Sequence, residues 1–403
     1  MKAESFLKAI ILSNGLTFTK KALSLAVTRH AKGQNLCYNM PDAEEALQRP
    51  QELCLRNRDD GYETVVSCVA PNKYNETILL DANDDSFFIS GSGFSYLNEL
   101  VQIDTVAEPN YYSTILSNGG VAKEYVSACG YDELNILPWR GCAISRQCAF
   151  CGINKISALA EKLYRPTAFE ISHSPTDWDR NESRYLSLLS EAILAARDDE
   201  IYADHLHTIM ISGNLSDPLL DFEAEIYARI ARRINPLLDG YSTEGLIAVM
   251  EPPPSDDRLI SMHQSGIEIV VFNLEVGCEP WNRMYCPGKN TITEDYILKR
   301  LYAAVPIFGD GRVWTNFVLG LEPISGLLER CEELARRGIV SSANVFHHDS
   351  GSRLVDFPPP SADASIYFFK SLAEIYRRHG FKPFYCAKAL RTSLSNEAYE
   401  GRL

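Results

Sequence analysis

The feature that most limits the fold of this 403-residue chain is an alternation that begins near Leu134 and continues almost to the C-terminus. Short apolar runs end in polar or Gly- and Pro-rich turns, and an amphipathic helical stretch follows each run. This order is typical of parallel βα units. The runs predict strands over 133–138, 207–212, 245–250, 267–275, 313–321 and 342–348.

The stretches between these runs predict helices by the spacing of their apolar residues. Leu and Ile recur at i, i+3 and i+4 over 183–206, and similar stripes cover 217–234 and 324–338. Gly338 follows a basic last turn, as expected at a helix C-terminus. Six units of this kind predict an α/β fold with a partial (β/α)6, TIM-like barrel over residues 126–390.

Residues 1–125 lack this alternation. After an opening helical segment they contain strand-like pieces such as YETVVSCVA and VQIDTVA, separated by Asn, Asp and Gly turns. We therefore expect a smaller α+β accessory domain ahead of the barrel, and a C-terminal tail over 391–403.

Composition excludes several classes of protein. The net charge of -14 and the pI near 5.1 argue against nucleic acid as the main partner. No run approaches the roughly 18 apolar residues that a membrane-spanning helix requires, so we expect a cytoplasmic protein without a membrane partner. Most of the eleven cysteines stand singly and do not predict a disulfide framework.

Three cysteines form the exception, in the segment GCAISRQCAFCGINK (141–155). Cys142, Cys148 and Cys151 have the spacing C-x5-C-x2-C and no adjacent fourth cysteine. A structural zinc site needs four N or S ligands, so zinc remains open only with a remote fourth ligand. A redox CxxC leaves Cys142 unexplained. An iron–sulfur cluster uses all three thiolates and leaves the fourth iron an open position.

This cysteine loop resembles that of the radical SAM superfamily, because it follows the first strand of a predicted barrel and has Phe150 before its third cysteine. The usual family spacing is C-x3-C-x2-C. The longer loop is similar in spacing to that of the maturase for the guanylylpyridinol cofactor of iron-only hydrogenase. The resemblance implies a [4Fe-4S] cluster on Cys142, Cys148 and Cys151, with S-adenosyl-L-methionine (SAM) bound at the open iron.

The ISGN turn that ends the second predicted strand resembles the family's Gly-rich turn, which binds the amino group of SAM. The match falls on Ser212, Gly213 and Asn214, although the common form has two adjacent Gly and an acidic residue. The alternative is an ordinary loop glycine with an Asn cap.

The segment FNLEVG after the fourth predicted strand resembles the biotin-synthase-like branch of the family. There the pair that corresponds to Asn273 and Glu275 reaches the ribose hydroxyls and the methionyl end of the cofactor. A CPGK turn follows at 286–289, and Arg300 stands where that branch has an arginine for the SAM carboxylate. Lys299 or Arg283 could take that position instead, and a capped strand end with a surface arginine is the alternative.

Other polar residues end predicted strands and are expected to line the same cavity. Because their chemistry is generic, we assign no catalytic residue among them. They are Glu251, Glu322, Asn344, His347 and His348.

The resemblance implies a biosynthetic enzyme that cleaves SAM reductively to a 5'-deoxyadenosyl radical and abstracts hydrogen from a small molecule. Cofactor and natural-product synthesis both fit, and methyl transfer, rearrangement and C–C bond formation stay open. An electron donor such as flavodoxin or ferredoxin is the implied partner. The alternative is a zinc-stabilised scaffold or binding protein without redox chemistry.

Overall fold

The computed structural model describes most of the chain and supports an α/β architecture. The described residues are 1–27, 49–139, 141–144, 148–155, 157–158, 175–199, 207–215, 219–289, 292–349, 351–383, 388 and 390–403. Parts of three expected features fall outside this set, namely the C-terminal end of the helix over 183–206, the first residues of the helix over 217–234, and Cys37 and Cys386 among the scattered cysteines.

The first sheet is built from the N-terminal part of the chain and has six strands in the order β1-β4-β5-β6-β2-β3. Only β1 and β4 pair in parallel, and the other neighbours are antiparallel. Helix α1 (Ala3–Asn14) packs on β2 and β3, whereas α2 (Lys20–Val27) packs on β4. The strands are β1 (Leu16–Phe18), β2 (Glu52–Asn57), β3 (Glu63–Ser67), β4 (Ile78–Ala82), β5 (Phe87–Ser90) and β6 (Val101–Thr105).

The second sheet carries the predicted alternation. Its strands lie in the order β13-β12-β11-β10-β9-β8-β7; neighbours from β8 to β13 are parallel, and β7 is an antiparallel edge strand. Sequential parallel neighbours are what right-handed βα crossovers produce. The strands are β7 (Val126–Cys129), β8 (Glu133–Ile136), β9 (His207–Ile211), β10 (Leu246–Val249), β11 (Ile267–Val271), β12 (Val313–Leu319) and β13 (Ile339–Val345).

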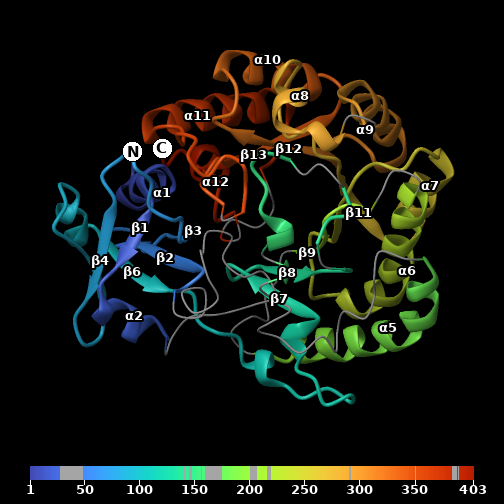
Figure 1. Ribbon diagram of the computed structural model, residues 1–403, viewed down its shortest axis with the longest axis horizontal. Helices are drawn as coiled ribbons and strands as arrows, with labels where there is room; N and C mark the ends of the chain where they lie inside the picture. Colours follow the sequence, from blue (N-terminus) through green and yellow to red (C-terminus); the bar gives the residue numbers. More distant parts are fainter. Residues whose placement is uncertain are drawn as a thin grey trace.

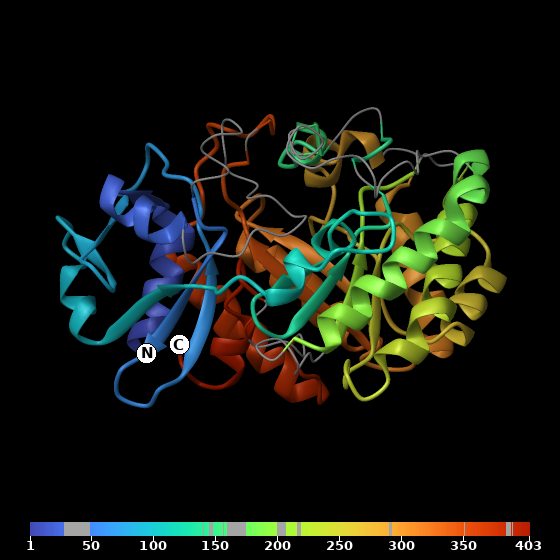
Figure 2. The same cartoon turned by 90° about the horizontal axis from the view of Figure 1, so that it is seen from below.

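Helices form an arc outside the second sheet, and the first sheet lies to one side of it (Figure 1). The strands of the second sheet are buried on both faces, which explains why they read as continuous apolar runs. Seen from below, the blue N-terminal part lies at one end of the molecule and the green and yellow helices lie at the other (Figure 2). The helices are α5 (Pro175–Arg197), α6 (Leu220–Leu238), α7 (Asp256–Gln264), α8 (Trp281–Tyr285), α9 (Glu294–Phe308), α10 (Ile324–Ala335), α11 (Ala362–His379) and α12 (Ser395–Tyr399).

Local signals explain where individual helices begin and end. The Ser361 hydroxyl accepts a hydrogen bond from Ala364 N at 3.1 Å and caps α11, which ends before Gly380 with a φ of 71°. Helix α5 begins at Pro175, earlier than the apolar stripe predicts, because proline is well tolerated in the first helical turn. Strand β13 begins three residues before the predicted run at 342, because the β-branched Ile339 and Val340 are buried in the sheet.

The two ends of the described chain lie together on the first sheet. Lys8 of α1 is buried and donates hydrogen bonds to Glu397 Oε1 at 2.8 Å and to Leu390 O at 2.9 Å. Lys2 N also donates to Arg402 O at 2.7 Å. Residues near the C-terminus therefore pack into the N-terminal part, while the boundaries at 125 and 390 remain predictions.

No helix among the described residues combines the length and the apolar character that crossing a membrane requires.

Candidate functional site

A cavity of about 140 Å³ lies where the parallel strands β8 to β11 end. In a sheet of this kind the loops after the strands share one edge, so residues far apart in sequence meet there. Its described lining residues are Cys142, Ile144, Cys148, Phe150, Cys151, Ile153, Ile211, Ser212, Gly213, Asn214, Val249, Met250, Glu251, Asn273, Glu275 and Lys289.

The three cysteines of the loop after β8 all line this cavity. Cys142 is fixed by Asn154, whose Oδ1 accepts from Cys142 N at 2.7 Å and whose Nδ2 donates to Cys142 O at 3.1 Å. Ala143 N donates to Asn214 O at 2.8 Å and so joins the cysteine loop to the turn after β9.

The second half of the loop is held by elements from the end of the sheet. Gly152 N donates to Asp349 Oδ2 at 2.7 Å, and Ala149 N donates to Tyr285 O at 2.6 Å. Burial raises the pKa of Asp349 to about 7, although the Gly152 N–H lowers it. The positions of Cys148 and Cys151 therefore depend on the segments after β11 and β13 as well as on their own loop.

The turn after β9 approaches the cysteine loop so closely that it requires glycine. A Cβ on Gly213 would lie 2.3 Å from Gly141 O and 2.7 Å from Cys142 Cβ. The Ser212 hydroxyl donates to Trp139 O at 2.9 Å and accepts from Trp139 N at 3.1 Å. A side chain at position 213 would clash with the cysteine loop, and this explains why the turn has glycine there.

A buried charge cluster forms one wall of the cavity. Lys289 Nζ lies 2.7 Å from Glu251 Oε1 and 3.2 Å from Glu275 Oε1, and it donates to Asn273 O at 3.0 Å. Asn214 Nδ2 donates to Glu251 Oε1 at 2.8 Å. With both carboxylates ionised and the lysine protonated, this cluster carries a net charge of -1, which suits a ligand with positive charge.

The electrostatics of this cluster follow from burial and pairing. Burial lowers the pKa of Lys289, but Glu251 and Glu275 outweigh it and raise this pKa well above the ordinary value. Burial raises the pKa of Glu251, against the opposing effect of Lys289. Among the described residues, Glu251 Oε2 has no hydrogen-bond partner.

Burial also raises the pKa values of the Cys142 and Cys151 thiols. Both therefore favour the protonated form until a metal binds, and metal binding would release their protons. Among the described residues, no three Cys, His, Asp or Glu side chains converge closely enough to hold a single metal ion. The cysteines share a cavity without forming a compact single-ion site.

Nine of the ten cofactor and metal residues predicted from the sequence line the cavity; the exception is Arg300. Arg300 is buried on α9, where its Nη1 lies 2.6 Å from Asp256 Oδ1 of α7. The alternative Arg283 is largely exposed on α8 and pairs with Glu279 at 3.2 Å, and Lys299 does not line the cavity.

Of the further polar strand ends, only Glu251 lines the cavity as expected. Glu322 accepts a hydrogen bond from Gly277 N, and Thr392 donates to Asn344 Oδ1 at 2.8 Å. The His347 ring is hydrogen-bonded to the carbonyl of Val345, and the His348 ring is hydrogen-bonded to the carbonyl of Phe357. These four residues serve local structure in the positions described.

Lys289 was the functional residue that sequence reasoning missed. It stands in the CPGK turn, which was recognised only as a turn, and it enters the cavity through the 3-10 helix Pro287–Lys289. Lys289 stands 14 positions after Glu275, in the segment that follows β11, and its charge could have suggested an ion-pair partner for Glu275.

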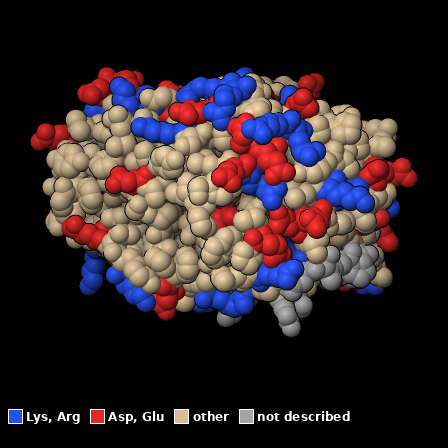
Figure 3. Space-filling view, turned by 90° about the horizontal axis from the view of Figure 1, so that it is seen from above, with Lys and Arg blue, Asp and Glu red and all other residues tan. Residues whose placement is uncertain are grey.

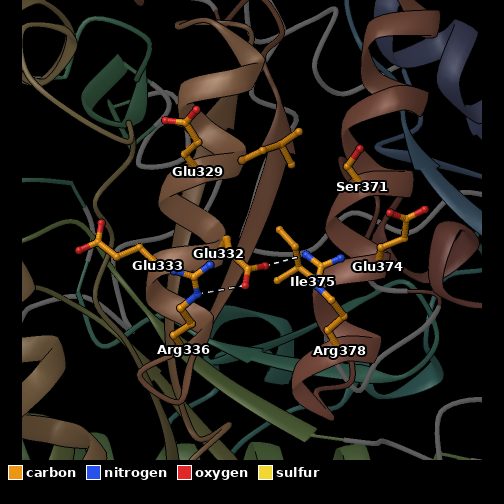
Figure 4. A pocket seen from close by; sticks show the side chains of 9 residues that line it. Glu329, Glu332, Glu333, Arg336, Ser371, Glu374, Ile375 and Arg378 are labelled. Atoms are coloured by element: carbon orange, nitrogen blue, oxygen red, sulfur yellow. Dashed lines mark hydrogen bonds and ion pairs between the residues drawn. The ribbon is translucent and has the colours of Figure 1, made fainter.

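A second hollow of about 620 Å³ lies on the outer surface between α10 and α11 (Figure 4). Ion pairs occupy it: Glu332 lies 2.6 Å from Arg378 and 3.3 Å from Arg336. Hydrogen bonds from Arg378 and His379 lower the pKa of Glu332 to about 2. None of the predicted site residues lines this hollow, so we assign the function to the cavity beside the cysteines.

Figure 3 shows one outer face, where Lys and Arg side chains alternate with Asp and Glu. The basic residues described on that face therefore do not form a continuous patch.

Comparisons with known proteins give a sequence relative and several distant structural likenesses. No family model matches the chain. The chain is 31% identical over 197 residues to the bacteriochlorophyllide c C-7(1)-hydroxylase of Chlorobaculum limnaeum, covering 47% of this chain and 48% of that protein. It therefore spans about half the length of this curated relative.

Two of the structural likenesses are to HydG, a maturase of [FeFe]-hydrogenase. One HydG structure has a TM-score of 0.39 and 14% identity, covering 68% of this chain and 53% of that chain. The HydG of Carboxydothermus hydrogenoformans has a TM-score of 0.35 and 12% identity, covering 60% and 50%. Scores this low do not bear on the fold described above. The cysteine loop and the strand ends around its cavity carry the resemblance to the radical SAM superfamily.

Proposed function

We propose that this protein is a radical SAM enzyme that acts on a small molecule in a biosynthetic pathway. The observation that carries the proposal is the shared cavity: Cys142, Cys148 and Cys151 line it together with Asn214, Asn273 and Glu275. The residues that would bind the cluster and those that would bind SAM therefore line the same cavity. Bound there, a [4Fe-4S] cluster with SAM supplies an electron for sulfonium cleavage and hence a 5'-deoxyadenosyl radical that abstracts hydrogen.

The donor set suits a cluster better than a single ion. A cubane assigns one thiolate to each of three irons, so its ligands stand further apart than those of a zinc ion. All three thiols line one cavity, as the ligands of a single cluster would. Cys142, Cys148 and Cys151 would hold the cluster, and no further cysteine lines the cavity within the described part of the chain.

The residues of this chain would bind SAM through its charged and hydroxyl groups. Asn214 stands where the family's turn has an acidic residue, and its side chain contacts Glu251, so we assign the missing negative charge to Glu251. Ser212 and Gly213 would offer their backbone carbonyls to the SAM amino group. Asn273 and Glu275 would face the ribose, and Phe150 would cover the cluster from the cysteine loop.

We also propose that Arg300 contacts the SAM carboxylate, but only in a side-chain conformation that differs from the one described. Its Nε and Nη2 are buried without a hydrogen-bond partner in the described structure, so the guanidinium has unused donors. Its ion pair with Asp256 directs it toward α7, however, and a different rotamer would be required to reach the cavity.

We further propose that β8 to β13 and their helices form the partial (β/α)6 barrel. Six sequential parallel strands with helices outside them support this. The N-terminal sheet would then be an accessory unit beside the barrel. Its opening helix is bound to the last residues of the chain through Lys8 and Glu397, which supports a fixed placement.

The substrate class follows only from the printed name of the relative, which acts on bacteriochlorophyllide c. A hydroxylase of this kind fits a biosynthetic setting, so we propose a small organic substrate and a protein electron donor such as flavodoxin or ferredoxin. We leave the bond that is made or broken unassigned.

The test is metal analysis of the protein purified without oxygen. We expect a brown protein with about four irons and a broad visible band. Cys142→Ala, Cys148→Ala and Cys151→Ala should each lose the colour, since each removes one ligand. Cys331→Ala, a buried cysteine of α10 that does not line the cavity, is the matched control and should keep it. A colourless protein with one zinc per chain would instead support the scaffold function.

A further inference from the structure

Cys286 lies directly behind one of the proposed cluster ligands. Its side chain is completely buried, and its thiol lies close enough to that of Cys148 for the two to interact. Cys148 lines the cavity, whereas Cys286 does not. Cys286 therefore lies next to Cys148 but outside the lining of the cavity.

Backbone contacts hold the two cysteines together independently of their thiols. Ala149 N, next to Cys148, donates to the carbonyl of Tyr285, next to Cys286, at 2.6 Å. Cys286 N continues α8 by donating to Asn282 O at 2.7 Å. A change at the Cys286 side chain should therefore leave the cysteine loop in place.

The pair lies against a small apolar cluster, in which weak hydrogen bonds gain strength because water is excluded. A thiol is a weak donor, but a metal-bound thiolate is a charged acceptor. The fully buried members of the cluster are Ala149, Val276, Tyr285, Cys286, Leu321 and Phe346, and Cys148 packs against them.

We propose that Cys286 is a positioning residue that donates an S–H···S hydrogen bond to the Cys148 thiolate and so raises the reduction potential of the cluster. This inference rests on the proposed function. Hydrogen bonds to ligand sulfurs raise such potentials because reduction adds negative charge that the donors stabilise. Cys286 would thus set how readily the cluster is reduced, while Cys142, Cys148 and Cys151 hold it.

The test is the midpoint potential of the reconstituted full-length protein, measured by EPR during an anaerobic redox titration. Cys286→Ala removes the donor and should shift the midpoint to a more negative value. Cys286→Ser keeps a donor and should lie closer to wild type than the alanine variant. Cys331→Ala, which removes a buried thiol of α10, should leave the midpoint unchanged.

Cys286→Ala with a full cluster and the wild-type midpoint would overturn the inference and leave the proposed function intact. The inference would also be overturned if both Cys286 variants lost the cluster while Cys148→Ala kept it. In that case Cys286, and not Cys148, would be the cluster ligand. If the alanine variant does not fold, ENDOR of reduced wild type and Cys286→Ser decides: an exchangeable proton near the cluster supports the hydrogen bond, and its absence contradicts it. A wild-type chain that assembles no cluster would overturn the proposed function as well.

Discussion

Lys289 is the residue on which the charge balance of the cavity depends. It is almost completely buried and contacts two carboxylates, Glu251 and Glu275, that would otherwise repel each other. Their ionisation in a dry environment costs free energy unless a cation is near. The lysine therefore offsets the negative charge of the two carboxyl groups in the wall of the cavity.

Lys289→Met should destabilise the metal-free protein by about 3–5 kcal/mol, because it leaves the buried Glu251 and the partly buried Glu275 without their cation. Urea unfolding at pH 7 measures this change. Lys370→Met, on the exposed face of α11, should stay within about 0.5 kcal/mol of wild type. Equal unfolding midpoints for the two variants would contradict the charge balance described for the cavity.

Helix α6 supports the turn after β9 through one carboxyl group. Glu223 is fully buried, and its Oε2 accepts a hydrogen bond from Leu215 N at 2.9 Å. Burial and the nearby Glu251 together raise its pKa to about 8, against the opposing effect of the Leu215 N–H. Leu215 directly follows Asn214, so this helix fixes a residue beside the cavity.

The raised pKa of Glu223 predicts a pH dependence of stability. Between about pH 4.5 and 8 the folded state binds more protons than the unfolded state, so the free energy of unfolding falls as pH rises. Glu223→Gln keeps an acceptor for Leu215 N and removes the titration, so its stability should fall less over this window. Unfolding midpoints from pH 5 to 8 measure the difference.

Asp349 and Asp132, whose pKa values burial raises to about 7 and about 6, change stability in the same direction. They are present in both proteins, so the comparison between wild type and Glu223→Gln isolates residue 223. Parallel curves for the two proteins would contradict a buried, protonated Glu223.

The helices and strands of the second sheet were largely predictable from the sequence. Most of the predicted site residues stand at the carboxyl ends of these strands. Parallel strands bring their carboxyl ends to one edge, so Ser212, Asn273 and Glu275 could be grouped without coordinates. Arg300 could not be placed, because the direction of a helical side chain depends on packing against α7. Lys289 depends on a short 3-10 helix whose course no periodic pattern predicts.

At the scale of the whole molecule, the sequence did not predict how the ends of the chain meet. Lys8 and Glu397 are 389 positions apart and carry no motif, yet both are buried in one ion pair. Such a contact arises from tertiary packing alone. It links the N-terminal sheet to the segment that follows α11, and so to the side of the second sheet that carries β13.

The whole-molecule claim is that this fold brings a cluster and SAM together for reductive cleavage. The most direct measurement is the anaerobic reaction of the reconstituted protein with SAM and dithionite, with 5'-deoxyadenosine quantified by mass spectrometry. We predict 5'-deoxyadenosine from wild type and from Cys331→Ala, and none from Cys151→Ala. A wild-type protein that holds about four irons and yields no 5'-deoxyadenosine would contradict the account.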